Sequence, residues 1–149
     1  MNLQAQYIVG FTDGEGCFHV GVSKQKSYQI GYQVLPEFTV TQHKRDIKIL
    51  YALKSYFNCG VVRNQRKNIY CYRVRKREHL INIIVPFFEK HPLKTLKNVD
   101  FRKFRKIVLL MEKGEHLNPA GFSRIMDILE RKKKLLKIES NSFGNTARQ

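Results

Sequence analysis

Two acids, Asp13 and Glu15, lie among glycines in the segment of residues 7–18, which has the sequence YIVGFTDGEGCF. The apolar residues before the acids predict a short helix, although a glycine in a helix interior costs about 1 kcal/mol relative to alanine. The acids follow at its C-terminal end, where the helix macrodipole is negative and a second negative charge is disfavoured. A cation stabilises an acid there. In a DNA-binding protein that cation could be Mg²⁺, which binds one or two carboxylates together with waters and phosphate oxygens.

The glycines of this segment have a spacing of their own. Gly10 and Gly14 are four residues apart, so they form a small notch on one face of the predicted helix. Such notches allow two helix backbones to approach closely. The spacing alone leaves open whether the partner is another element of the same fold or a second chain. Asp13 and Glu15 are two residues apart and therefore point in different directions, so they can have different roles.

The charge balance narrows the class of protein. The 149 residues contain 28 Lys and Arg against 12 Asp and Glu, a net charge of +16. Such a surplus opposes compaction by self-repulsion, and it favours a polyanionic partner. We interpret the partner as nucleic acid in preference to an anionic membrane surface.

The cysteines and the lack of long apolar runs indicate a reducing compartment inside the cell. No apolar run reaches the length of a membrane span, and no signal peptide opens the chain. The three cysteines, at positions 17, 59 and 71, have no CxxC pair and no zinc-like spacing, so we interpret them as reduced thiols. We expect an intracellular location, whether organellar matrix (chloroplast or mitochondrion), nucleus or prokaryotic cytoplasm.

The hydrophobic periodicity predicts an α+β fold in one domain, residues 1–139, followed by a mobile tail over residues 140–149. Hairpins imply antiparallel strands, so the helices must cover one face of a single sheet and leave the other face polar and basic. The expected elements, in chain order, are a helix over 3–14, a long hairpin over 18–41, a helix over 43–58, a shorter hairpin over 60–75, and helices over 78–88, 100–113 and 118–138.

The outward side chains of the hairpins are candidates for DNA recognition, because a two-stranded ribbon fits the major groove. Their donors and acceptors recur at alternate positions, as contacts to base edges require. On the long hairpin these residues are His19, Gly21, Ser23, Gln25, Gln33, Glu37 and Thr39. On the shorter hairpin they are Arg63, Gln65, Arg73 and Arg75.

The segment IVGFTDGEG, residues 8–16, resembles the LAGLIDADG motif of the homing endonucleases. Three further segments are similar to that family in the family's order: residues 38–50, 86–104 and 118–128. The resemblance implies the LAGLIDADG homing endonuclease fold, an α-β-β-α-β-β-α core with an antiparallel, saddle-shaped DNA-binding sheet and added C-terminal helices. The sequence departs from the motif's name at Thr12, Gly14 and Glu15, which replace Ile, Ala and the final Asp.

The resemblance also implies an assembly and a substrate. Family members with one motif copy pair their motif helices across a two-fold axis, so this chain is expected to act as a homodimer. The substrate is then double-stranded DNA with a long, pseudo-palindromic site. The residues implied at the dimer interface are Tyr7, Gly10, Asp13 and Gly14.

By the same resemblance, the reaction is metal-dependent hydrolysis of phosphodiester bonds. Glu15 is implied as the ligand of Mg²⁺ or another divalent ion, with the Gly14 carbonyl beside it. Gln42 would orient water, Lys97 would stabilise charge on the phosphate, and Arg45 is a weaker candidate for the same pocket. His43 is disfavoured as a general base.

Two alternatives to a nuclease remain open. One is a protein of the same fold that does not cut, such as a DNA-binding regulator or an intron RNA splicing factor (a maturase). The other is a basic protein that coats nucleic acid without specificity. The acids of DGEG argue against the coating protein, and the carboxylate of Glu15 favours the enzyme over the first alternative.

Overall fold

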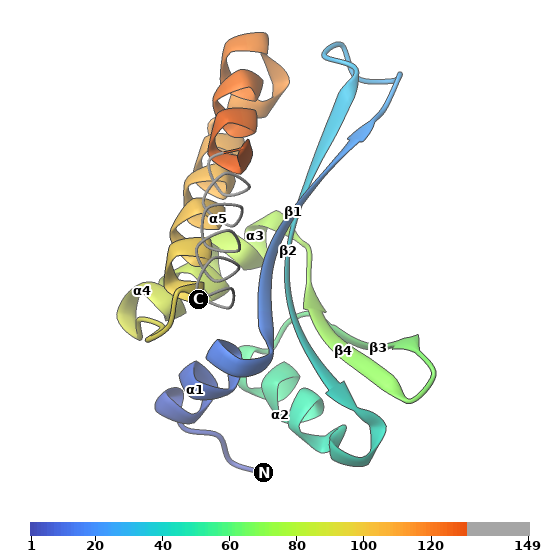
Figure 1. Cartoon of the computed structure of the whole chain (residues 1–149), viewed down its shortest axis with the longest axis vertical. Helices are drawn as coiled ribbons and strands as arrows, with labels where there is room; N and C mark the ends of the chain where they lie inside the picture. The colour runs from blue at the N-terminus through green and yellow to red at the C-terminus, as the bar shows by residue number, and fades with distance from the viewer. Residues whose placement is uncertain (131–149) are drawn as a thin grey trace, which may run out of the picture.

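The computed structural model describes residues 1–130 and shows one four-stranded antiparallel sheet with helices packed on it (Figure 1). The expected end of the last helix and the expected tail at 140–149 lie outside the described residues. The elements are α1 (Ala5–Glu15), β1 (Gly16–Lys24), β2 (Tyr32–His43), α2 (Lys48–Phe57), β3 (Val61–Arg66), β4 (Ile69–Val74), α3 (Arg77–His79), α4 (Val85–Lys90) and α5 (Lys97–Glu112), and residues 119–130 form a further helix.

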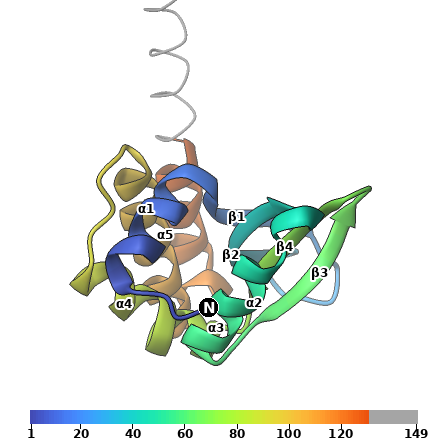
Figure 2. The ribbon, with the colours of Figure 1, turned by 90° about the horizontal axis from the view of Figure 1, so that it is seen from below.

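The sheet has the strand order β1-β2-β4-β3, with every neighbouring pair antiparallel. Figure 1 shows the sheet curving away from the helices at both ends, so that its uncovered face is concave. Seen from below, α1, α4 and α5 group on one side and β3 forms the far edge (Figure 2). The predicted element order and the predicted covering of one face are both confirmed.

A cluster of aromatic rings joins the sheet to its helices. Phe18 of β1 lies at its centre, with its ring centroid 5.1 Å from that of Phe38, 5.4 Å from Phe88, 5.3 Å from Phe101 and 5.4 Å from Phe104. These rings come from β1, β2, α4 and α5. The alternation of Phe18, Val20 and Val22 in the sequence predicts that Phe18 points inward, and the structure confirms it. Burying rings of this size supplies much of the apolar stabilisation of the fold.

The free end of the long hairpin has its own support. β4 pairs with β2 only from Phe38 to His43, so residues 32–37 of β2 have a neighbouring strand on one side alone. A second apolar cluster holds this part of the hairpin against the helices, and the rings of Tyr32 and Phe122 stack with centroids 5.2 Å apart. The buried members of the cluster are Val34, Ile107, Met111 and Ile125.

Helix α2 corrects the predicted apolar face. The spacing of apolar residues in the sequence predicts a face made of Ile47, Leu50, Tyr51, Leu53 and Phe57, but the Tyr51 side chain is exposed and Ile49 is buried. In α2 the buried residues 49, 50, 53 and 57 lie within one arc of the helix, and Tyr51 lies about 100° beyond Leu50, outside that arc. A 3-10 turn over Lys44–Asp46 precedes α2, so the helix does not begin at residue 43.

The helices after the sheet also differ from their predicted bounds. The predicted helix over 78–88 is a continuous run from α3 through a π-helical segment, Leu80–Ile84, to α4. The proline at position 86 removes one backbone donor, and a π segment beside it accommodates the lost hydrogen bond. Helix α5 begins at Lys97, three residues before the predicted start.

The sequence Asn118-Pro119 predicts the cap and the first residue of the final helix, and the structure confirms both. The amide of Gly121 donates to Asn118 Oδ1 over 2.8 Å, as an N-cap asparagine requires, and proline follows at the first helical position. Within residues 1–130, no helix is both long and apolar enough to cross a bilayer.

The shorter hairpin contains an irregularity that the alternation does not predict. Arg63 pairs with Cys71 and Asn64 with Tyr70, but the next pair is Arg66 with Ile69. Gln65 is therefore the extra residue of a β-bulge. Simple alternation therefore does not decide which face of the sheet Gln65 occupies, and its predicted contact with DNA stays a prediction.

Replacing Phe18 by alanine tests the aromatic cluster. We expect Phe18→Ala to lower the free energy of unfolding by about 3–5 kcal/mol, because it removes the ring that contacts four others. Denaturant unfolding followed by circular dichroism measures the change. The neighbouring exposed residue gives the control, and His19→Ala should change the free energy by less than about 0.5 kcal/mol. Equal losses in the two variants would contradict this assignment of the core.

Candidate active site

Helix α1 has a buried face and an open face. Ile8, Val9 and Thr12 are buried against the core, whereas Gly10 and Gly14 lie on the exposed side. A Cβ atom built on either glycine would have no heavy atom within 4 Å in the described chain. The notch therefore does not serve packing between elements of this fold among residues 1–130. A flat, side-chain-free surface is left open.

The end of α1 presents the carboxylate of Glu15. Glu15 is the last residue of the helix and is exposed, and Gly16 follows in an extended conformation as the first residue of β1. Within residues 1–130, no hydrogen bond or ion pair engages the Glu15 carboxylate. The last four carbonyls of a helix lack intrahelical partners, and the carbonyl of Gly14 belongs to this turn. Oxygen atoms suited to a hard cation thus lie at the helix end.

Asp13 joins α1 to the loop before α5. Its Oδ2 accepts a hydrogen bond from the Lys94 amide at 2.9 Å. Its Oδ1 accepts from the Thr95 amide at 3.2 Å and from the Thr95 hydroxyl at 2.7 Å. These three bonds span more than eighty positions of sequence. They use the Asp13 carboxylate within the chain, so its predicted place at a dimer interface stays a prediction.

The loop held by Asp13 leads directly to Lys97. The Thr95 hydroxyl accepts a hydrogen bond from the Lys97 amide at the start of α5, and the Lys97 ammonium donates to the carbonyl of Gly16. The Lys97 ammonium is thus anchored on the residue directly after Glu15, so a cation and an exposed carboxylate both lie at the C-terminal end of α1.

The electrostatics of Asp13 follow from these contacts. Partial burial acts to raise the pKa of its carboxyl group, but the hydrogen bonds from Lys94 and Thr95 and the charge of Lys97 outweigh that effect. The pKa of Asp13 is therefore lowered from its usual value of 3.8. Asp13 is ionised at neutral pH and attracts Lys97 towards the site.

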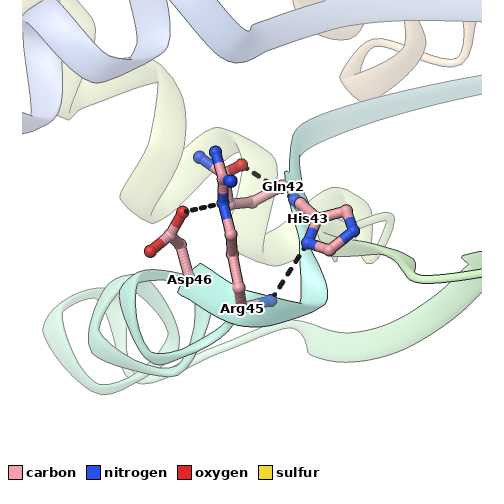
Figure 3. A network of polar contacts seen from close by, with 4 residues as sticks. All are labelled: Gln42, His43, Arg45 and Asp46. Atoms are coloured by element: carbon pink, nitrogen blue, oxygen red, sulfur yellow. Dashed lines mark hydrogen bonds and ion pairs between the residues drawn. The ribbon is translucent and has the colours of Figure 1, made fainter.

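Gln42, His43 and Arg45 form a local network at the end of β2 (Figure 3). Gln42 Oε1 accepts from the His43 amide at 2.8 Å, and His43 Nδ1 accepts from the Arg45 amide at 3.2 Å. Arg45 Nε is 3.2 Å from Asp46 Oδ2, in an ion pair of exposed side chains. His43 thus caps the turn before α2, and the expectation that it is no general base stays a prediction.

The strand register decides how these residues relate to Glu15. Gly16 pairs with Val40, so Gln42 lies two residues past that pair, beside the end of α1. No hydrogen bond links Gln42 or Arg45 to Glu15 or Lys97 in the described part of the chain. Their predicted catalytic roles stay predictions.

The open face of the sheet carries the predicted polar residues. His19, Ser23 and Arg63 are exposed, Thr39 and Arg73 are partly exposed and pair with each other, and Gln25 begins the turn after β1. Glu37 differs from the others, because its Oε2 accepts from Arg75 Nε at 2.7 Å. The strand residues of the predicted set other than Gln65 thus lie along one face, and its one acid, Glu37, is already paired with Arg75.

The open face also includes one exposed apolar side chain and one buried thiol, neither of which was predicted. Leu35 is 40% exposed and lies opposite Gly21, and Cys71 is buried although Arg63 pairs with it on β3 and Arg73 follows two residues later in β4. Burial raises the pKa of the Cys71 thiol despite the opposing charges of Arg73 and Arg63, so this thiol is protonated at neutral pH. Alternation could have placed Leu35 outward, since the pattern Gln33, Leu35, Glu37 is visible in the sequence.

Lys94 and Thr95 are further residues that sequence reasoning missed. Both lie in the loop that supports Lys97, and the signal was a threonine two residues before a helix start, which is a capping position. Their contact with Asp13 is a tertiary contact, so spacing could not have predicted it.

The sequence matches the family model described as LAGLIDADG endonuclease over residues 8–108. Among curated proteins, the chain is 35% identical over 128 residues to the probable intron-encoded endonuclease 2 of Neurospora crassa, covering 84% of this chain and 28% of that protein. It is 29% identical over 87 residues to the DNA endonuclease I-CeuI of Chlamydomonas moewusii, covering 57% of this chain and 40% of that protein. The chain spans between 26% and 33% of the length of the first curated relatives it matches.

Solved structures agree with the sequence matches. The crystal structure of the homing endonuclease I-TnaI superposes with a TM-score of 0.84 at 53% identity, covering 92% of this chain and 98% of that chain. The LAGLIDADG homing endonuclease I-SmaMI bound to cleaved DNA has a TM-score of 0.81 at 31% identity, covering 84% of this chain and 42% of that chain.

The bonds of Asp13 predict a pH-dependent contribution to stability. At pH 6, we expect Asp13→Ala to lower the free energy of unfolding by about 1 kcal/mol, because it removes the acceptor of three hydrogen bonds. The pKa is lower in the folded state than in the unfolded state, so this contribution is present above the unfolded value. It is lost as the pH falls below 3.8 and through the folded pKa. The difference between the proteins should therefore shrink towards pH 3.

Denaturant titrations at several pH values measure this difference. Asp127→Ala is the matched control, because Asp127 is exposed and makes no hydrogen bond with any residue of the described range. A difference between wild type and Asp13→Ala that is the same at pH 3 and pH 6 would contradict the assignment.

Proposed function

Because the chain belongs to the LAGLIDADG endonuclease family, we propose that it is a sequence-specific endonuclease of double-stranded DNA. The proposed protein acts as a homodimer on a long, pseudo-palindromic site and hydrolyses one phosphodiester bond in each strand with a divalent metal ion. I-SmaMI is a family relative that has been crystallised with cleaved DNA. The proposal extends this activity to the present chain.

The observation that carries the proposal is that a carboxylate and an ammonium are held at the same end of α1 without pairing with each other. Glu15 exposes its carboxylate there, and the Lys97 ammonium is hydrogen-bonded to the carbonyl of the next residue, Gly16. A phosphate group placed against this end would meet a metal-binding acid and a cation together. Lys97 would stabilise the negative charge that develops on the phosphate, since a preset cation needs no reorganisation during the reaction. Gln42 would orient the attacking water from the neighbouring strand.

The residues present fit a metal ion shared between two chains. Within residues 1–130, no group of three or more metal-binding side chains occurs, and Glu15 offers a single carboxylate with the Gly14 carbonyl near it. Mg²⁺ accepts such a sparse protein set, because waters and phosphate oxygens complete its octahedral shell. When bound, the ion would lower the pKa of water and stabilise the leaving oxygen. The calcium present with I-SmaMI on uncleaved DNA supports a divalent ion in that relative.

The open face of α1 supports the homodimer. The Tyr7 side chain is 53% exposed beside the bare surface of Gly10 and Gly14, and one turn of helix separates each from the next. An apolar, glycine-notched face allows a second copy of the helix to approach closely. A two-fold axis there would bring two Glu15 residues together over the DNA and align two concave sheets along it.

A non-cleaving role of the same fold is the alternative outcome. The names of several relatives describe them as encoded in introns. In this alternative the ligand would be an intron RNA, and the location would be an organelle. Incubation with Mg²⁺ and a randomised double-stranded DNA library separates the roles. Recurrent ends within one near-palindromic site support the endonuclease. Selective retention without cleavage would refute cutting and point to a DNA-binding protein or a maturase.

The catalytic role of Glu15 is tested by Glu15→Gln. We expect the rate of cleavage to fall by about 10³-fold or more, because the variant loses the charge that holds the metal, a loss of about 4 kcal/mol or more in the transition state. Specific binding should stay within about threefold of wild type, since Glu15 contacts no base edge in the proposal. Single-turnover cleavage and a gel-shift titration measure the two quantities.

Asp127→Asn is the control for Glu15→Gln, because it also removes one exposed carboxylate but lies on the helix of residues 119–130. It should cut at the wild-type rate. A Glu15→Gln protein that cuts as fast as this control would show that Glu15 is not the metal-ligating acid.

The dimer interface is tested by Gly10→Leu. The variant should sediment as a monomer, because a leucine side chain fills the notch needed by the second helix. It should remain folded, since nothing in the described chain lies within 4 Å of the added Cβ. Replacing glycine in a helix should even stabilise the monomer by up to about 1 kcal/mol. Ser55→Leu on the exposed side of α2 is the control and should stay dimeric. A Gly10→Leu protein that is folded and dimeric would exclude this interface.

A further inference from the structure

We infer that Glu37 and Arg75 form a preset pair that recognises a guanine in the major groove of each half-site. The inference rests on the proposed function and deepens it, because it assigns one base contact to two named side chains.

The pair joins two strands across the open face of the sheet. Glu37 lies in β2 opposite His19 of β1, and Arg75 is the residue directly after β4. Arg75 Nε donates to Glu37 Oε2 over 2.7 Å, which is a short, charge-assisted hydrogen bond. The Arg75 side chain is 52% exposed, whereas that of Glu37 is 21% exposed. The acid thus lies beneath the guanidinium, which faces solvent on the side proposed to meet DNA.

The bond leaves the recognition groups of Arg75 free. It uses Nε alone, and the two terminal amino groups make no hydrogen bond to any residue in the range 1–130. These groups are parallel donors with a fixed spacing. Guanine presents two acceptors, N7 and O6, on its major-groove edge, and a bidentate arginine is the commonest specific contact to it. An arginine held in advance loses less side-chain entropy when it binds.

The surrounding charges explain why an acid occupies this face. A carboxylate that faces DNA repels the phosphates, so its place there requires a compensating role. Arg63 and Arg73 lie on the same face, and burial followed by repulsion from Arg75 and Arg63 lowers the pKa of Arg73. Neither Arg63 nor Arg73 forms a hydrogen bond or ion pair with a described residue. Glu37 therefore fixes one of three mutually repelling arginines and leaves the other two for phosphates.

A contact of Arg75 with a guanine is distinguished from a contact with a phosphate by replacing one ring nitrogen, N7, of the base with a C–H group. The site is first selected from the library, and binding is then measured in Ca²⁺ by fluorescence anisotropy. Each guanine of the half-site is replaced in turn by 7-deazaguanine, which lacks the N7 acceptor but keeps the base pair. At one position we expect wild-type affinity to fall about tenfold. At that position Arg75→Ala should lose less than twofold, because its contact is already absent.

Glu37→Gln tests the positioning role. The variant keeps an acceptor for Arg75 but removes the charge. Its loss of affinity when 7-deazaguanine replaces guanine at that position should therefore fall from about tenfold to about threefold. The matched control is a second arginine–glutamate pair of the same geometry, Arg105 Nε to Glu89 Oε1 at 2.8 Å, located between α5 and α4. Glu89→Gln and Arg105→Ala should retain the full tenfold sensitivity.

The outcomes separate this inference from the proposed function. The inference is overturned if wild type selects and cuts a site, but wild type and Arg75→Ala lose the same affinity on 7-deazaguanine substitution at every guanine. The proposed nuclease activity would then still stand. Direct acceptance by Glu37 of a hydrogen bond from the amino group of a cytosine would give this result. A half-site without guanine overturns it likewise. A protein that selects no DNA sequence overturns the proposed function, and the inference with it.

Discussion

The attachment of α1 to the start of α5 is the contact on which the candidate site depends. Asp13 accepts three hydrogen bonds from the loop before α5, and Lys97 donates to the carbonyl after Glu15. The acid of this junction thus comes from α1 and binds the loop before α5, whereas the cation comes from α5 and binds the backbone just after α1. Because both ends are fixed, Glu15 can remain exposed and without a partner in the described chain while a cation stays beside it.

The two faces of the sheet divide the work of folding and recognition. Phe18 and its neighbouring rings hold the helices to one face, so the opposite face needs no contribution to the core and can carry polar and charged groups. The curvature of the sheet turns that face into a concavity (Figure 1). The second cluster, around Ile107, supports the hairpin where β4 no longer accompanies β2. A long ribbon can therefore project without losing its register.

Repulsion among basic groups shapes the open face. Arg63, Arg73 and Arg75 lie close enough to lower the pKa of Arg73 by burial and mutual repulsion, and Glu37 is the acid among them. A polyanion relieves this repulsion, which contributes affinity but no sequence information. The geometry of one fixed pair can add that information. Arginines of this face without a partner in the described chain would thus attract DNA of any sequence, whereas Arg75, fixed by Glu37, would select a base.

The sequence by itself determined the element order, the antiparallel sheet, its polar face and the motif at residues 8–16, because these depend on local periodicity and on residue types. It also placed Asn118 as a cap and Phe18 in the core. It did not predict the β-bulge at Gln65, because strict alternation contains no signal for an extra residue in one strand, or the exposure of Tyr51 on α2. The burial of Cys71 depends on packing between β4 and its neighbouring strands. Above all, only the tertiary structure decided that Asp13 binds residues 94 and 95 and that Lys97 reaches Gly16. Hydrogen bonds between groups more than eighty positions apart leave no periodic signal in a sequence, and they exist only once both segments are packed on the same sheet.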